Sequence, residues 1–90
     1  MPEAIVMVNV DVGREEEVFN SIFSIQEVKE VYMVYGVHDI IAVLEATDLE
    51  TLRSTIINRI RRIEGVKGTI TSIVVKRQTK SCGHGASQPS

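Results

Sequence analysis

The motif Ile-x-x-Val-Lys occurs twice in this 90-residue chain, at Ile25–Lys29 and at Ile63–Lys67. Each copy follows a stretch with helical spacing of apolar residues and precedes a stretch rich in β-branched residues, so each marks a helix-to-strand junction. Two βαβ halves would require such a repeated junction. Ninety residues are within the range of one small domain, so both halves belong to the same domain.

A first strand is predicted by strict alternation at the start of the chain. One apolar face would contain Ala4, Val6, Val8, Val10 and Val12. The other, mixed face would contain Ile5, Met7, Asn9 and Asp11. This pattern is typical of a strand with one side in the core and the other only partly covered.

A helix is expected after Gly13, because Glu15, Glu16 and Glu17 suit the positive end of a helix dipole. Its apolar residues recur at helical spacing, at Val18, Phe19, Ile22 and Phe23. This helix should end near Ser24 to Gln26. Two β-rich runs then follow, Val28–Tyr35 and Ile40–Leu44, joined by Gly36–Asp39. Two such runs around a short segment with Gly and Asp predict a β-hairpin.

Asp48 is a suitable N-cap for a second helix. Its apolar stripe is Leu49, Leu52, Ile56, Ile60 and Ile63, and its opposite side is expected to carry Arg53, Asn58, Arg61 and Arg62. Gly65 is predicted as the C′ residue with positive φ. A last strand would run from Val66 to Arg77.

The order βαββαβ predicts an α+β fold, a ferredoxin-like sandwich with an antiparallel four-stranded sheet and two helices on one face. The other face would be open and would include Ile5, Met7, Ile41 and Val43. An open apolar face on a small domain favours a partner surface, so a face-to-face homodimer is expected.

Composition excludes several classes of protein. The chain is 43% hydrophobic, without an apolar run near the roughly 20 residues of a membrane span, and no signal peptide is readable. Cys82 is the only cysteine, which fits a reducing cytoplasm. A net charge of −2 without a clear basic face argues against direct specific DNA binding. The domain is expected to span residues 1–79, and residues 80–90 to form a disordered tail.

Two segments resemble the effector domain of the Lrp/AsnC (leucine-responsive regulator) family. Residues Val28–Val43 are similar to its second and third strands, which flank a Gly-x-Tyr-Asp turn; here the turn is Gly36-Val37-His38-Asp39. Residues Gly65–Val75 resemble the family's Pro-Gly-Val-x-x-Thr-x-Thr-Ser strand. The resemblance extends from about Ala4 to Arg77, and the two motifs together are fairly specific.

The resemblance implies a stand-alone amino-acid-sensing and oligomerisation module without a helix-turn-helix. In that family the domains dimerise through their sheets, dimers assemble into rings, and amino-acid effectors bind between dimers. Such a module would modulate transcription through full-length Lrp/AsnC-type regulators, with no enzymatic activity, catalytic residue or cofactor.

By the same resemblance the effector-binding positions are Tyr35, Gly36, His38, Asp39, Thr69, Thr71 and Ser72. Asp39 could accept from an ammonium group, while hydroxyls and turn amides could donate to a carboxylate. His38 stands where the family commonly has Tyr, and Tyr35 where it often has Thr, so the family's side-chain preference does not transfer directly.

These residues also have structural interpretations. Gly36 could serve only to allow positive φ, and Asp39 could close the hairpin through a side-chain-to-backbone bond. Thr69 and Thr71 suit any exposed strand, and His38 a polar loop. Cys82 and His84 are too few ligands for a zinc site, so no metal is expected.

Three other functional classes fit the same topology. A small dimeric α/β-barrel enzyme, an oxygenase or isomerase, would use His38 or Asp39 as acid or base, but no second group forms an obvious pair with either. An ACT-like amino-acid-binding domain and a purely structural assembly protein are the others.

Overall fold

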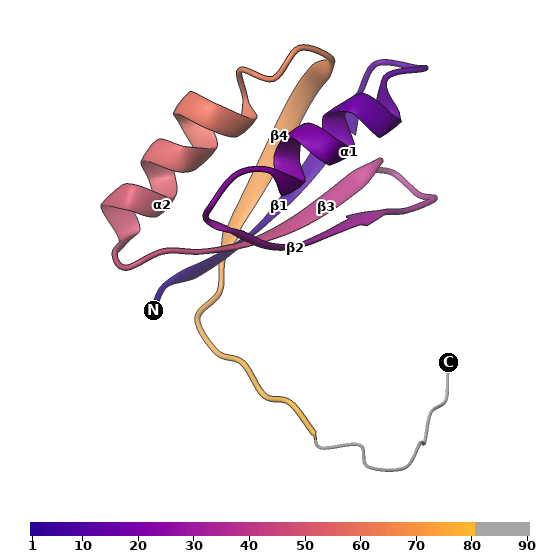
Figure 1. The fold of residues 1–90 in the computed structure, drawn as a ribbon. Helices are drawn as coiled ribbons and strands as arrows, with labels where there is room; N and C mark the ends of the chain where they lie inside the picture. The colour runs from indigo at the N-terminus through magenta and orange to yellow at the C-terminus, as the bar shows by residue number, and fades with distance from the viewer. Residues whose placement is uncertain (81–90) are drawn as a thin grey trace.

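The computed structural model describes residues 1–80, and its strands and helices follow the predicted order βαββαβ. The strands are β1 (Glu3–Val10), β2 (Val28–Met33), β3 (Ile40–Glu45) and β4 (Val66–Ile73). The helices are α1 (Glu15–Phe23) and α2 (Leu49–Thr55), and a π-helical turn η1 (Ile56–Ile60) continues α2. The sheet is antiparallel with the order β2-β3-β1-β4 (Figure 1), so the ferredoxin-like α+β fold is confirmed.

The core lies on one face of this sheet. Val6 and Val8 of β1 are fully buried, as are the residues opposite them in β3, Ala42 and Ile40. Both helices contribute to the same buried cluster, through Val18, Ile22, Leu52, Ile56 and Ile60. Since burial of one aliphatic side chain stabilises a fold by about 1.5–3 kcal/mol, this shared core holds both helices on one face. None of the described residues of β4 belongs to the buried cluster.

The start of the second helix agrees with the sequence-based prediction, but its end does not. The Asp48 carboxylate accepts a hydrogen bond from the Thr51 backbone N–H at 2.7 Å, so the predicted N-cap is confirmed. This bond holds the pKa of Asp48 below its usual value, since it stabilises the charged form. Gly65 has φ +103°, but it lies in the turn before β4 and not directly after the helix, which ends at Ile60.

Three strand boundaries were predicted too long. Val12 lies beyond β1 and is 93% exposed, because β1 ends at Val10. β2 ends at Met33, which pairs with Ile40, the first residue of β3. β4 ends at Ile73 because β1 begins near there; the Val74 backbone N–H donates to the Glu3 carbonyl and the ladder stops.

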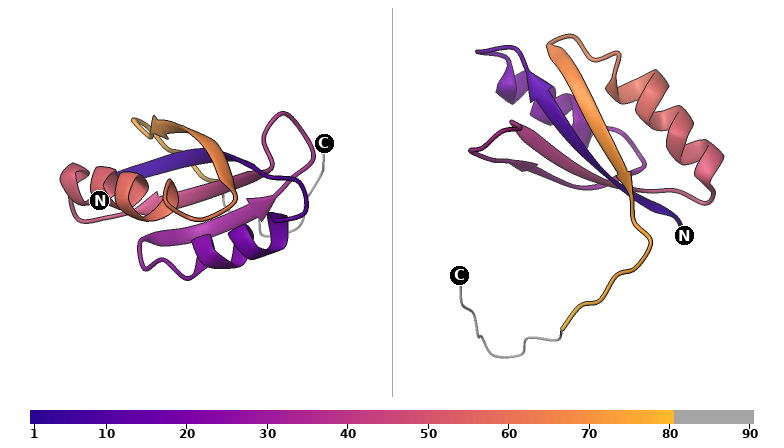
Figure 2. Two further views of the ribbon diagram at one scale, coloured as in Figure 1. Left: turned by 90° about the horizontal axis from the view of Figure 1, so that it is seen from above. Right: turned by 180° about the vertical axis from the view of Figure 1, so that it is seen from behind.

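The opposite face of the sheet carries no helix of the described chain, and Figure 2 (right) views it from behind. The register places four apolar side chains in one row across all four strands. This open-face row is Tyr32, Ile41, Met7 and Ile70. Tyr32 and Ile70 at its ends are about half exposed, at 48% and 53%. The open apolar face expected from the alternation is therefore present, with Ile5 and Val43 beside the row.

The predicted tail lies outside the described residues apart from Lys80, and so do Cys82 and His84. Between residues 1 and 80, no helix has the length and apolar character needed to cross a bilayer.

Candidate functional site

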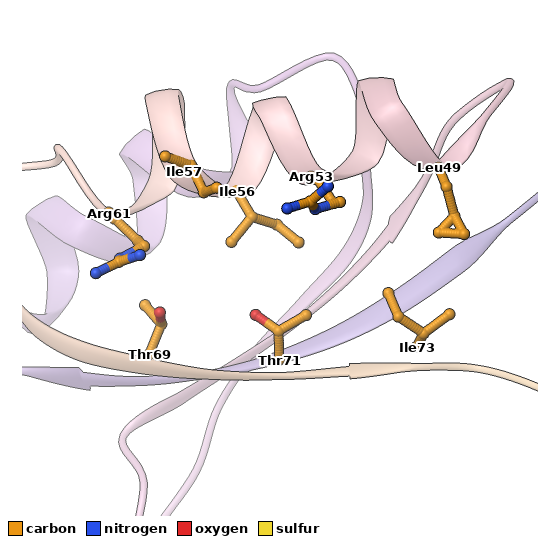
Figure 3. Close-up of a pocket in the computed structure, with 8 residues that line it drawn as sticks. All are labelled: Leu49, Arg53, Ile56, Ile57, Arg61, Thr69, Thr71 and Ile73. Carbon is orange, nitrogen blue, oxygen red and sulfur yellow. The ribbon is translucent and has the colours of Figure 1, made fainter.

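A groove separates the second helix from the edge strand β4 (Figure 3). Its volume is about 430 Å³, within the range of small-molecule pockets. The helix side supplies Leu49, Arg53, Ile56, Ile57 and Arg61, and the strand side supplies Thr69, Thr71 and Ile73. This α2–β4 groove exists because β4 pairs with β1 at the sheet edge but buries no side chain beneath the helix.

The strand register explains why the threonines face the groove. Thr69 pairs with Val8 and Thr71 with Val6, both of which point into the core. Paired residues in antiparallel strands share a face, so both threonines lie on the helix side. Ser72 pairs with Ile5 and therefore lies on the opposite, open face.

The other candidate residues lie in the loop between β2 and β3. Asp39 is part-buried: its carboxylate accepts a hydrogen bond from the Val10 backbone N–H at 2.8 Å, and its own N–H donates to the Val8 carbonyl. His38 Nδ1 lies 3.1 Å from Asn9 Oδ1. The loop is thus tied to the end of β1, while the Tyr35 side chain is fully exposed.

Gly36 is exposed and its φ is not positive; the positive-φ glycines of the described chain are Gly13 and Gly65. The interpretation of Gly36 as a positive-φ turn residue is therefore wrong. A Cβ added there would meet nothing within 4 Å, so the backbone at this position is open to solvent.

One chain thus places the seven predicted residues in three locations: the β2–β3 loop, the α2–β4 groove and the open face. Val8 links the first two, because its carbonyl binds the loop at Asp39 while its neighbour in β4 is Thr69. The threonine side chains and the Asn9 side chain that holds His38 nevertheless point to opposite faces of the sheet, as the alternation along β1 requires.

Two groove residues were assigned to the wrong side of the helix from sequence. Arg53 and Arg61 were expected opposite the apolar stripe, but both line the groove. The signal that could have found them is the spacing of four in Leu49, Arg53, Ile57 and Arg61. Neither arginine takes part in the ion pairs formed among residues 1–80.

Two charged groups on β2 have side-chain partners. Lys29 on β2 lies 3.0 Å from Glu45 on β3, and this contact holds the pKa of Glu45 below its usual value. Tyr32 donates a hydrogen bond to Glu30, which raises the pKa of the phenol. Among the first 80 residues, no group of three His, Cys, Asp or Glu side chains could hold a metal ion.

A family model of the Lrp/AsnC ligand binding domain matches residues 3–82 of the sequence. The chain belongs to this family. No curated protein sequence matches it. The β2–β3 loop and the β4 threonines therefore lie within a Lrp/AsnC ligand-binding domain, whose known context is regulatory.

Several solved structures share this fold. The protein FFRP-DM1 is 33% identical with a TM-score of 0.80, over 83% of this chain and all of its own. A protein from Thermus thermophilus is 28% identical with a TM-score of 0.83, over 89% of this chain and all of its own.

A third neighbour is a transcriptional regulator from Neisseria meningitidis in complex with L-Met. It is 19% identical with a TM-score of 0.80, over 93% of this chain but only 56% of its own. This chain therefore spans about half the length of that regulator. At this level of identity the likeness shows a shared fold.

Proposed function

We propose that this domain senses an amino acid and, by oligomerising, modulates transcription through Lrp/AsnC-type regulators in the cytoplasm. Membership of the ligand-binding family supports the sensing role. The Neisseria regulator, a distant relative with the same fold, is described with bound L-Met, which supports an amino acid as the effector class.

The observation that supports oligomerisation is the open-face row, which consists of Tyr32, Ile41, Met7 and Ile70. A contiguous apolar row on an exposed sheet face is typical of a protein interface. Two copies packed sheet to sheet would remove these side chains from water and would add to the limited core that a domain of this size can form. We therefore infer a face-to-face dimer, and rings built from such dimers.

We further propose that the effector site is completed between dimers. One chain leaves the loop residues Tyr35, Gly36, His38 and Asp39 apart from the groove residues Thr69 and Thr71, with Ser72 on the open face. Groups from neighbouring protomers would bring these parts together. One oxygen of Asp39 is held by Val10, and its other oxygen would accept from the effector's ammonium group.

A thermal-shift screen of the protein against the twenty amino acids tests this function. An amino acid present at 100 times its Kd should stabilise the fold by about 2.7 kcal/mol, which is a readily measured rise in Tm. A rise with one or a few amino acids supports sensing. An unchanged Tm with all twenty at millimolar concentration contradicts it.

A further inference from the structure

The α2–β4 groove combines apolar walls with cationic and hydroxyl groups. Its walls include four aliphatic side chains, Leu49, Ile56, Ile57 and Ile73. Its polar groups are two arginines on the helix and two threonines on the strand, and no acidic residue lines it. Figure 3 shows the arginine side chains on the helix side of the gap and the Thr69 and Thr71 hydroxyl groups across from them.

We infer that this groove binds a small aliphatic carboxylate, with Arg53 and Arg61 binding the carboxylate and the aliphatic side chains enclosing the tail. The inference rests on the proposed function, because it assigns the carboxylate end of the effector to the groove. Guanidinium groups bind carboxylates through paired, charge-assisted hydrogen bonds, and threonine hydroxyls can add further donors.

The charge around the groove is uncompensated within the described chain. The ion pairs among residues 1–80 use Arg14, Lys29 and Arg77, and not the groove arginines. Glu50 of α2 lines a different depression, on the side of the helix that carries Arg59. An adjoining hollow of about 280 Å³ shares Arg61 and Thr69 with the groove and adds Lys67. A carboxylate would therefore enter a region whose charged side chains are all cationic.

The π-helical turn sets the position of Arg61. The Arg61 backbone N–H donates to the Ile56 carbonyl, five residues earlier, at 3.0 Å. In a regular α-helix, residues eight apart, such as Arg53 and Arg61, would differ by about 80° around the axis, because one turn takes 3.6 residues. The wider turn contains an extra residue and reduces this offset, so both arginines line the same groove. Such turns occur frequently at functional sites.

The groove chemistry also limits the ligand. About 430 Å³ is ample for an aliphatic chain of the size of leucine's. An ammonium group would find only cations and hydroxyls among the lining residues, so its acceptor would have to come from another protomer. A 2-oxo acid has the same tail and carboxylate but no ammonium group. The shared chemistry is thus an aliphatic carboxylate, available as an amino acid or as the corresponding 2-oxo acid.

Titration calorimetry distinguishes an amino acid from a 2-oxo acid as the ligand of the groove. The ligands are L-valine, L-leucine, L-isoleucine and L-methionine, the 2-oxo acids of the first three, and leucinamide, in which the carboxylate is neutralised. The proteins are wild type, Arg53→Gln, Arg61→Gln, and the control Arg59→Gln, which removes the same charge from the same helix outside the groove. All three side chains are exposed, so unchanged melting curves are expected for the variants.

We expect carboxylate ligands to bind wild type and Arg59→Gln alike, and each groove variant to bind about tenfold more weakly or worse. Leucinamide should not bind. If amino acids bind all four proteins equally, the groove assignment is overturned and amino-acid sensing stands. If only 2-oxo acids bind, and need both arginines, the groove assignment stands and amino-acid sensing fails. If no carboxylate binds wild type, the groove assignment is overturned.

Discussion

The Asp39 carboxylate accepts a hydrogen bond from the Val10 backbone N–H at 2.8 Å, joining the β2–β3 loop to a strand 29 residues earlier. Val10 is also where the pairing of β1 with β4 shifts register. One side chain therefore holds the loop that carries most of the predicted effector residues, and the same residue is the candidate acceptor for an ammonium group. The structural role of Asp39 and its proposed binding role therefore fall on one carboxylate, and substitutions must separate them.

Asp39→Ala should destabilise the fold by about 1–3 kcal/mol, because the Val10 N–H loses its acceptor in a part-buried site. Asp39→Asn removes the negative charge but keeps an acceptor oxygen, so it should lower the free energy of unfolding by less than Asp39→Ala. Urea denaturation of both variants measures the difference. Equal and negligible losses would show that the bond to Val10 contributes nothing to stability.

Gly65→Ala should destabilise more than Gly13→Ala. Both glycines have positive φ, +103° and +90°, which costs a residue with a Cβ about 1–2 kcal/mol. At Gly65 the new Cβ would also lie 3.0 Å from Val18 Cγ2, whereas at Gly13 it meets nothing within 4 Å. Gly68→Ala, in open space within β4, is the control and should stay within about 0.5 kcal/mol. Equal losses at Gly65 and Gly13 would contradict the close approach to Val18.

Met7→Asp should convert the proposed dimer to a monomer without unfolding it. Met7 lies at the centre of the open-face row, between Ile41 and Ile70, and does not belong to the buried core. A charge buried between two sheets without a partner is strongly unfavourable. Phe23→Asp is the matched control, since Phe23 is an exposed apolar residue of α1, away from that face. Sedimentation velocity should show wild type and Phe23→Asp above the 10.0 kDa monomer mass and Met7→Asp at it.

A wild type that sediments as a monomer at micromolar concentration would overturn the face-to-face dimer, and so would a Met7→Asp variant that remains dimeric.

Protonation of the Asp48 carboxylate should make the fold less stable in acid. The pKa of its carboxyl is lowered in the folded protein by the Thr51 backbone N–H. A lowered folded pKa contributes stability above the unfolded pKa, near 3.9, and this contribution is lost as the pH falls through the folded value. Asp48→Asn keeps the capping geometry without the titrating charge. The Tm advantage of wild type over Asp48→Asn should therefore be present at pH 6 and shrink as the pH falls below the unfolded pKa, near 3.9. A constant difference would contradict the cap's charge dependence.

The fold could be predicted from sequence because its determinants are local. Alternation along Ala4–Val10, the Asp48 cap and the repeated helix-to-strand junctions each reflect residues close together in the chain. The strand ends could not be predicted, because β2 and β4 stop where their partners do. Tyr35 favours a strand by type, yet nothing pairs with it among the described residues.

The candidate site was only partly predictable for a related reason. The Asp39–Val10 bond spans the sheet, so the turn motif alone gave no sign of it. The position of Arg61 relative to Arg53 was not predictable from a regular helical repeat, because a π-helical turn at Ile56–Ile60 lies between them. The threonine motif did identify the strand that forms one wall of the groove.

The central claim is that a Lrp/AsnC-type domain senses an amino acid through groups on the β2–β3 loop and β4. Calorimetric titration of wild type, Asp39→Asn and Thr71→Val, with the amino acid selected by the thermal-shift screen, tests it most directly. We expect saturable binding to wild type, a loss of about tenfold or more for Asp39→Asn, and a smaller loss for Thr71→Val, which removes one hydroxyl, about 0.5–1.5 kcal/mol. Equal affinity for all three folded proteins would contradict the site, and no binding to wild type would contradict the sensing role itself.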